Sequence, residues 1–387
     1  MFYRDLKPEL EEAASQYPIV TVTGPRQSGK TTLVQETFPN KTYINLEAPD
    51  IRERILADPR SFFEKYQQEG AILDEIQRAP QLLSYLQILV DEMQRKGHFI
   101  LTGSHQLELQ SAIAQSLAGR TALLTLYPMS LHELTEAGYY KTLDEYLLLG
   151  GYPRIFKDKL DPHKAYRNYF QTYVERDLKQ LIHVKDLGQF QRFVRLVAGR
   201  IGQLLNAESL ANDVGVSANT IKQWISVLEA SFILVRLYPY FENFGKRIIK
   251  SPKIYFTDVG LATYLLGIET LPQMERDPLR GHLVENLIFL ELMKTRMNKG
   301  LDPQLYFFRD THGHEIDFVF QKGHQLVPME AKAAKTFSTD FVKNIHFFQK
   351  LVGERAPIGF IISDSPLKES FQAIRLIPYL QASEVVS

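Results

Sequence analysis

The feature that most constrains this chain is the pattern G-x-x-x-x-G-K-T at residues 24–31. It follows an apolar run at residues 18–23 and precedes a segment with helical spacing, which is the context of a strand–loop–helix unit. Glycines in such a loop let the backbone approach phosphate oxygens, and the N–H groups at the start of the helix point toward them. The pattern therefore predicts a phosphate-binding loop with a nucleoside triphosphate as its ligand.

Separate tasks are expected of the residues in this loop. Lys30 is predicted to contact the β- and γ-phosphates, and the Thr31 hydroxyl to complete the shell of a Mg²⁺ ion. The alternative is a glycine-containing turn that matches the pattern without binding a nucleotide. The predicted nucleotide-binding set comprises Gly24, Pro25, Arg26, Gln27, Ser28, Gly29, Lys30, Thr31 and Thr32.

A pair of carboxylates, Asp74 and Glu75, ends the apolar run at residues 71–73. Ligands of open α/β sheets bind at the carboxyl ends of the strands, so we expect this pair beside the phosphate loop. Asp74 is predicted to hold Mg²⁺, and Glu75 to act as the general base on an attacking water. The alternative is a surface strand that happens to end in acids.

Two more residues complete the predicted catalytic set of Lys30, Glu75, Ser104 and Arg120. Ser104 lies at the tip of the predicted strand at residues 98–104, where it would contact the γ-phosphate or the lytic water; an ordinary turn serine is the alternative. Arg120 is a candidate to neutralise charge during phosphoryl transfer, either in its own subunit or in a neighbour of a homo-oligomer. A surface salt bridge is the alternative for Arg120.

Composition restricts the class of protein. The chain of 387 residues is longer than one hydrophobic core ordinarily accommodates, so two or three domains are expected. Hydrophobic residues make up 44% and charged residues 23%, as in globular proteins, and the absence of cysteine excludes disulfides and thiolate metal sites. No apolar run reaches the length of a membrane span, and the first residues lack a signal-peptide pattern. We expect a cytoplasmic protein with no membrane partner.

The middle of the chain is basic and predicts a winged helix. Residues 1–150 contain 14 basic and 20 acidic residues, whereas residues 151–250 contain 16 and 9, which favours an anionic partner there. Two helices at residues 208–214 and 219–228 flank a tight turn, and strands follow at 232–237 and 253–256. The predicted DNA contacts are Ser217, Asn219, Thr220, Lys222 and Gln223 near the start of the second helix, with Lys246 and Arg247 in the wing. Because winged helices also dock proteins, a protein partner is the alternative to DNA.

The last third contains a second acidic pattern. Asp317 lies in a predicted strand, and Glu330 and Lys332 lie in the strand after a hairpin, which is the spacing of a PD-(D/E)XK nuclease core. Strand geometry puts Glu330 and Lys332 on one face. Asp317 and Glu330, with Glu285 from the preceding helix, are predicted to gather a divalent cation, and Lys332 to steady a hydrolytic water or the leaving charge. The alternative is a solvated surface.

These motifs, with Leu101–Ser104 and Gly150–Pro153, resemble the arrangement in prokaryotic AAA-superfamily ATPases fused to a C-terminal PD-(D/E)XK-like domain of unknown function. The resemblance covers essentially the whole chain and implies ATP binding and hydrolysis. It implies an α/β fold with three domains. These are an AAA-type P-loop NTPase sheet with a helical lid at residues 1–160, a helical linker and winged helix-turn-helix at 161–260, and an α/β restriction-endonuclease-like domain at 261–387.

Two functions are consistent with this arrangement. In the first, ATP hydrolysis gates a switch that acts on DNA through the winged helix and the nuclease-like domain. In the second, a regulatory ATPase uses the winged helix and the C-terminal domain as non-catalytic modules that dock protein or DNA. The sequence leaves both open.

Overall fold

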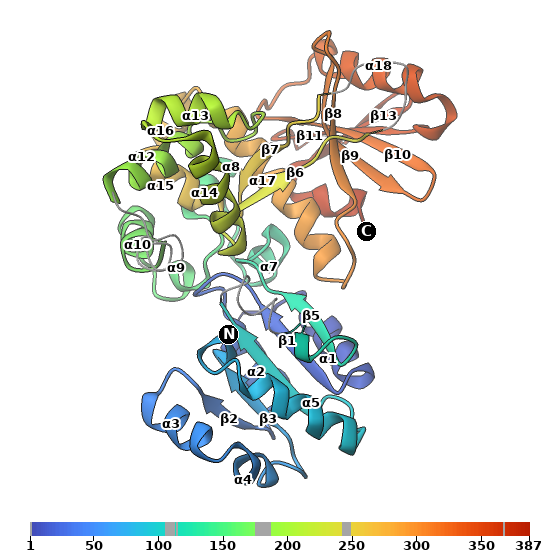
Figure 1. Ribbon diagram of the computed structural model, residues 1–387. Helices are drawn as coiled ribbons and strands as arrows, with labels where there is room; N and C mark the ends of the chain where they lie inside the picture. Colours follow the sequence, from blue (N-terminus) through green and yellow to red (C-terminus); the bar gives the residue numbers. More distant parts are fainter. Residues whose placement is uncertain (1, 105–112, 114, 175–186, 242–248, 367) are drawn as a thin grey trace. The chain divides into compact units, whose positions relative to one another are not determined.

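A computed structural model of the chain describes residues 2–104, 113, 115–174, 187–241, 249–366 and 368–387 (Figure 1). The chain forms two compact units. The first comprises Met1–Met129, Ala230–Phe232 and Met297–Leu301, and the second comprises the remaining segments. Residues 130–160 group with the second unit, and no boundary separates residues 161–260 from 261–387. The division into three domains therefore stays a prediction.

A five-stranded parallel sheet forms the centre of the first unit (Figure 1). The strand order is β2–β3–β4–β1–β5. The bounds are β1 Ile19–Thr23, β2 Thr42–Asn45, β3 Ala71–Asp74, β4 Phe99–Gly103 and β5 Thr121–Thr125. Because β1 and β3 both pair with β4, their carboxyl ends lie at one edge. This confirms the predicted α/β P-loop core.

Helices cover both faces of this sheet. Alternate residues of a strand face opposite layers, so Val20 and Val22 pack with α1 and α2, whereas Ile19 lies in the core that includes α3, α4 and α5. Burial on both faces explains why the strands are apolar throughout. The helices are α1 Lys7–Gln16, α2 Lys30–Thr37, α3 Pro49–Ala57, α4 Pro59–Glu64, the 3₁₀ turn η1 Ile76–Arg78, and α5 Leu82–Met93.

The second unit contains a six-stranded mixed sheet in the order β12–β13–β11–β10–β9–β8 (Figure 1). The pairs β8–β9, β9–β10 and β12–β13 are antiparallel, and β10–β11 and β11–β13 are parallel. Helix α18, Lys343–Val352, connects β10 to β11 and packs on the sheet through Ile345 and Phe348. The bounds are β8 Leu305–Arg309, β9 Glu315–Lys322, β10 Gln325–Lys332, β11 Gly359–Ser363, β12 Glu369–Phe371 and β13 Ile374–Pro378.

Two helices and a strand pair lie in the middle of the chain, as the sequence predicts. Helix α13, Ala207–Val214, ends at Gly215 with φ +84°, and α14, Ala218–Ala230, follows after a short turn. Strands β6, Leu234–Leu237, and β7, Lys253–Phe256, pair antiparallel. The predicted elements are present, while their assignment to the winged-helix class remains a proposal.

Helix α17, Arg280–Met297, is the buried helix of the second unit. All twelve residues from 283 to 294 are buried, so this helix is surrounded by protein rather than lying on a surface. It carries polar residues into the interior, among them Glu285 and Asn286. Among the helices that the structure describes, none is both long and apolar enough to cross a membrane.

The Gly-Gly-Tyr-Pro motif has a packing role. The Gly151 N–H donates to the buried Asp258 carboxylate at 2.7 Å, and a Cβ on Gly150 would lie 2.0 Å from the Tyr166 hydroxyl.

The remaining elements of the unit are α7 Leu131–Glu136, α8 Leu143–Leu149, α9 Pro153–Lys157, α10 Pro162–Tyr169, the π-turn η2 Phe170–Val174, α12 Leu187–Ala198, α15 Val259–Leu265, α16 Leu271–Arg276, and the 3₁₀ turns η3 Thr339–Val342, η4 Gly353–Arg355 and η5 Tyr379–Val385.

Candidate functional site

The loop between β1 and α2 has a shape that only glycine permits at two positions. Gly24 has φ +143°, and a Cβ there would lie 2.2 Å from the Leu126 carbonyl oxygen. Gly29 has φ +96° and precedes the first residue of α2. Replacing either glycine with another residue would strain the backbone, because L-residues rarely adopt such φ values. The loop therefore has the backbone that the phosphate-binding pattern predicts.

Lys30 is buried within this loop, with 6% of the residue exposed. Its Nζ donates to the carbonyl oxygens of Gly24 at 3.0 Å and Pro25 at 2.8 Å. Burial lowers the Lys30 pKa to about 8, an effect that the nearby carboxylates of Glu75 and Asp74 partly oppose. The hydrogen-bond partners of this ammonium in the loop are thus neutral carbonyl groups.

Asp74 receives three hydroxyl groups at the end of β3. Thr31 Oγ1 donates to its two oxygens at 3.1 and 3.2 Å, and the Tyr43 hydroxyl donates at 2.6 Å. Thr102 from β4 also donates to this carboxylate. Thr31 and Asp74 therefore meet as the sequence predicts, whereas Tyr43 was not anticipated. Burial and the bond to Asp74 raise the Tyr43 pKa above its ordinary value, so its hydroxyl stays a donor.

Glu75 lies next in the chain with φ +59°, a left-handed conformation that is uncommon for a residue with a side chain. Its carboxylate accepts hydrogen bonds from Ser104 Oγ at 3.1 Å and from the Gln77 amide. The amide also contacts Ser104 Oγ at 3.3 Å. Strained backbone of this kind concentrates at functional sites. The predicted general base and the predicted polar residue of β4 are thus in direct contact.

Arg4 supports the phosphate loop and was not anticipated from the sequence. Its guanidinium donates to the Ser28 carbonyl at 2.6 Å and to the Tyr127 carbonyl at 2.7 Å, and the residue is 6% exposed. It precedes the helix α1 and lies 24 residues from the loop, so no local pattern marks it. Arg4 fixes the path of the loop backbone.

The residues of this site suit ATP and Mg²⁺. The hydroxyl and carboxylate oxygens of Thr31 and Asp74 are the hard ligands that Mg²⁺ prefers. The Ser28 hydroxyl is fully buried in the loop, and none of the described residues hydrogen-bonds to its Oγ. A buried polar atom of this kind calls for a polar ligand.

Arg120 forms a surface ion pair. Its guanidinium binds the Asp91 carboxylate of α5 through two contacts of 2.6 and 2.7 Å, and both side chains are substantially exposed. This is the alternative that the sequence leaves open for Arg120. Its role in catalysis stays a prediction without a contact to support it.

The predicted DNA-contacting residues lie at the start of α14. Ser217, Asn219, Lys222 and Gln223 are exposed and Thr220 is partly exposed, while Ile221 and Trp224 are buried. The Ser217 hydroxyl accepts the Thr220 N–H at 3.1 Å and so caps the helix. Lys246 and Arg247 lie outside the described residues. DNA contact stays a prediction.

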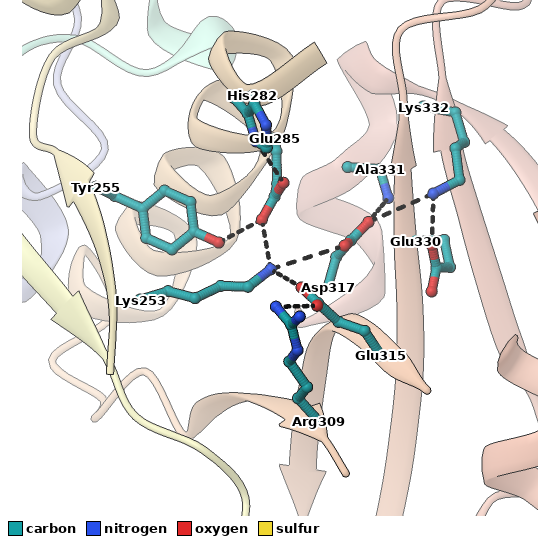
Figure 2. A network of polar contacts seen from close by, with 10 residues as sticks. All are labelled: Lys253, Tyr255, His282, Glu285, Arg309, Glu315, Asp317, Glu330, Ala331 and Lys332. Carbon is teal, nitrogen blue, oxygen red and sulfur yellow. Dashed lines mark hydrogen bonds and ion pairs between the residues drawn. The ribbon is translucent and has the colours of Figure 1, made fainter. Parts of the chain in front are cut away.

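The acidic pattern of the second unit forms a buried charge cluster (Figure 2). Asp317 and Glu330 lie on adjacent strands, β9 and β10, and Glu285 lies on α17. Lys332 Nζ is 2.5 Å from Glu330 and 3.6 Å from Asp317. Glu330, Asp317 and Lys332 are thus in contact, as the spacing predicts.

Further residues of this cluster were not predicted, among them His282, whose Nδ1 lies 3.7 Å from Glu285 Oε2, and four others. Lys253 and Tyr255 of β7 reach the Glu285 carboxylate at 2.9 and 2.5 Å, and Lys253 also lies 2.5 Å from Glu315. The fourth, Arg309, lies 3.0 Å from Glu315. Lys253 and Tyr255 share one face of β7 because they are two residues apart in a strand. This part of the arrangement can be read from the sequence. Nothing local indicates that their partner is a helix thirty residues away.

The ionisation of the cluster follows from these contacts. Burial alone would lower the Lys253 pKa, but the attraction of Glu285, Asp317 and Glu315 outweighs burial and raises it. Burial likewise opposes ionisation of Glu285, yet Lys253 and the neighbouring hydrogen bonds lower its pKa to about 2. In the described part of the chain, no group of three or more His, Asp or Glu side chains has a geometry that could hold a metal ion. The predicted metal role of Glu285, Asp317 and Glu330 therefore lacks support.

Three families match consecutive parts of the chain. Residues 16–135 match the family described as AAA domain. Residues 140–271 match a domain of unknown function (DUF8612), and residues 280–381 match another (DUF4143). The first match covers the parallel sheet and its phosphate loop, which makes this unit an AAA-type P-loop domain. Neither of the other two families describes a nuclease or a winged helix.

Similar proteins are uncharacterized. A protein of Mycobacterium tuberculosis and one of Mycobacterium bovis are each 32% identical over 340 residues, which cover 86% of this chain and 74% of the relative. A protein of Haemophilus influenzae is 23% identical over 344 residues, which cover 80% of this chain and 81% of the relative. These matches extend well beyond the AAA domain.

Solved structures resemble the chain more distantly. The Walker-type ATPase of Pyrococcus abyssi covers 68% of this chain and 96% of its own, at 16% identity and a TM-score of 0.46. AMPPCP-bound DnaA of Aquifex aeolicus covers 58% of this chain and 85% of its own, at 14% identity and a TM-score of 0.31. Likenesses of this degree carry no argument about function.

Proposed function

This chain belongs to the family of the two mycobacterial proteins, and we propose that it binds ATP with Mg²⁺ at its phosphate loop and hydrolyses it. The observation that carries the proposal is the contact of Glu75 with Ser104 and Gln77 beside the loop. It supplies a carboxylate that can activate water at the position where an AAA-type sheet binds phosphate. A kinase would need a site for an acceptor substrate instead.

The loop residues hold the triphosphate and the metal ion. The N–H groups at the start of α2 and the Lys30 ammonium bind the β- and γ-phosphates. The oxygens of Thr31 and Asp74 hold Mg²⁺, which supplies positive charge to the phosphate oxygens when bound. Among the described residues, the hydrogen-bond partners of Lys30 are the neutral carbonyls of Gly24 and Pro25, so a phosphate oxygen is a stronger partner than those it leaves.

The hydrolytic step is a displacement at the γ-phosphorus. A water oxygen forms a bond to this phosphorus while the Glu75 carboxylate accepts the proton of the water. The bond from the γ-phosphorus to the bridging oxygen breaks, and ADP leaves with the electron pair as phosphate forms. Ser104 and Gln77 keep the Glu75 carboxylate directed toward this water through their hydrogen bonds.

Exchange of one carboxylate for an amide tests this proposal. Glu75→Gln keeps the size and the hydrogen-bonding ability of the side chain but removes the base. We expect ATP turnover to fall by about 100-fold or more while a fluorescent ATP analogue still binds. Glu69→Gln, an exposed glutamate before β3, is the matched control and should behave as wild type. Unchanged turnover in Glu75→Gln would refute the assignment of the base.

We propose further that the second unit binds duplex DNA through α14. The basic balance of residues 151–250 and the exposed polar side chains at the start of α14 support this role. The affinity for a mixed-sequence duplex should fall steeply with salt, and Lys222→Gln should weaken it, with Lys299→Gln as the control. Affinity that does not depend on salt, or no binding, would favour a protein partner.

The C-terminal sheet is proposed to serve as a docking module without cleavage activity. The observation that favours this alternative is the position of Lys253, whose ammonium lies among the acids predicted to hold a metal ion. Supercoiled plasmid should therefore remain intact with this protein, ATP and either Mg²⁺ or Mn²⁺. Nicks that disappear in Lys332→Ala would restore the nuclease hypothesis.

A further inference from the structure

A lysine lies in the acidic cluster of the second unit where the sequence predicts a metal ion (Figure 2). Lys253 Nζ is 2.9 Å from Glu285 Oε1, 2.5 Å from Glu315 Oε1 and 3.9 Å from Asp317 Oδ1. The side chain is 2% exposed, so bulk water does not separate it from these acids. Two of the three carboxylates, Glu285 and Asp317, belong to the predicted metal-ligand set.

We propose that the ε-ammonium of Lys253 takes the place of a divalent cation in this cluster, which is a structural charge network and not a nuclease centre. Mg²⁺ binds oxygen ligands at about 2.0–2.1 Å and retains several waters. The ammonium, 2.9 Å from Glu285 and 3.9 Å from Asp317, takes up space beside two of the predicted ligands of such an ion. It also repels a second positive charge at short range.

Hydrogen bonds from β7 to α17 hold Lys253 in this position. Tyr255, on the same face of β7, donates to Glu285 Oε1 at 2.5 Å. Asn286 accepts the Phe256 N–H and donates to the Phe256 carbonyl, both at 2.8 Å. The strand that carries Lys253 is thus fastened at two successive residues to the helix that carries Glu285. Lys253 is therefore part of the packed interior of the second unit.

The lysine of the nuclease-like pattern is engaged in the same network. Lys332 Nζ contacts both Glu330 and Asp317, so its charge neutralises these acids. With Arg309 on Glu315, three cations face the four carboxylates of the cluster.

The network also joins two matched families. Lys253 and Tyr255 fall within residues 140–271, and their partners fall within residues 280–381. A metal site would need only the second segment, whereas this network needs both. The cluster therefore ties β7 to α17 and β9 within the second unit.

Manganese binding to the nucleotide-free full chain tests the proposal. Free Mn²⁺ is measured by electron paramagnetic resonance for wild type, Glu285→Gln and Asp317→Asn. We expect the three proteins to bind equal amounts of Mn²⁺, because the residues of the cluster bind none of it. Lys253→Met should gain one bound ion per chain, and adding Glu285→Gln to it should remove that ion. Lys322→Met, an exposed lysine of β9, should behave as wild type.

Three results would overturn the proposal. The first is a wild-type Mn²⁺ ion that is lost in Glu285→Gln or Asp317→Asn. The second is a folded Lys253→Met that gains no ion. The third is plasmid nicked by the wild type with Mn²⁺ but not by Lys332→Ala. If Lys253→Met does not fold, as its circular dichroism would show, the comparison of wild type with Glu285→Gln and Asp317→Asn still decides.

Discussion

Each of the two units buries a lysine near carboxylates, and the pKa values of the two lysines are shifted in opposite directions. Burial lowers the pKa of Lys30 to about 8, and the attraction of Glu75 and Asp74 opposes this effect only in part. Burial also acts on Lys253, but contacts with carboxylates outweigh it and raise the pKa. The comparison teaches that direct ion pairs with carboxylates can reverse the effect of burial on the pKa of a lysine.

The acids differ in the same way. Asp74 and Glu75 receive hydrogen bonds from neutral hydroxyl and amide groups, so their negative charge remains available to a metal ion and a water. Glu285 instead receives the Lys253 ammonium, and Glu330 receives that of Lys332. Similar residue types thus form a site that can accept a cation in one unit and a network that already contains its cations in the other.

The largest expected effect concerns the network. Lys253→Met should lower the free energy of unfolding by about 3–5 kcal/mol, because it leaves buried carboxylates without their cation. Chemical denaturation of the two proteins measures the difference. The matched control, Lys322→Met on β9, should change it by less than about 0.5 kcal/mol. Equal stability of Lys253→Met and wild type would mean that the network contributes no stability.

Lys30→Ala should have the next largest effect. Removal of the ammonium that binds the phosphates should reduce ATP turnover by about 100- to 1,000-fold. A coupled assay of ADP release measures this change. Because the side chain donates its hydrogen bonds to loop carbonyls and forms no direct ion pair with a described carboxylate, the stability of the chain should fall much less than in Lys253→Met. ATP turnover that survives in Lys30→Ala would contradict the phosphate-loop assignment.

The pH dependence of stability should separate the two lysines. Between pH 8 and 10.5 the folded chain loses the Lys30 proton while the unfolded chain keeps it, so stability rises relative to Lys30→Met. The shift of 2.5 units corresponds to a rise of roughly 3 kcal/mol. The pKa of Lys253 is raised above its unfolded value of 10.5, so the difference in stability from Lys253→Met should be constant up to about pH 9.5 and should then fall as the unfolded chain releases this proton. If the stability difference from the Met variant changed with pH by the same amount for both lysines, the opposite pKa shifts of Lys30 and Lys253 would be contradicted.

Ser104→Ala should have the smallest effect. It removes one hydrogen bond of about 1 kcal/mol from the Glu75 carboxylate, while Gln77 continues to hold it. Turnover should therefore fall about 5- to 10-fold with ATP affinity unchanged. A loss as large as that in Glu75→Gln would instead assign Ser104 a direct part in the hydrolytic step.

The sequence predicted the parts of the fold and the site that depend on local patterns. The phosphate loop, the strand ending in Asp74 and Glu75, and the meeting of Asp317 with Lys332 all follow from short spacings and strand periodicity. The residues that it missed act over long separations. Arg4 reaches the loop from 24 residues away, and Lys253 reaches a helix 32 residues further on. Such pairings depend on which surfaces the folded chain brings together, and no local pattern encodes them.

The number of divalent cations that the chain binds together with a nucleotide tests the central claim most directly. With a saturating non-hydrolysable ATP analogue, we predict one Mn²⁺ per chain by electron paramagnetic resonance. This ion should be lost in Asp74→Asn and retained in Glu285→Gln. A second Mn²⁺, or a single ion that depends on Glu285 instead of Asp74, would contradict the account.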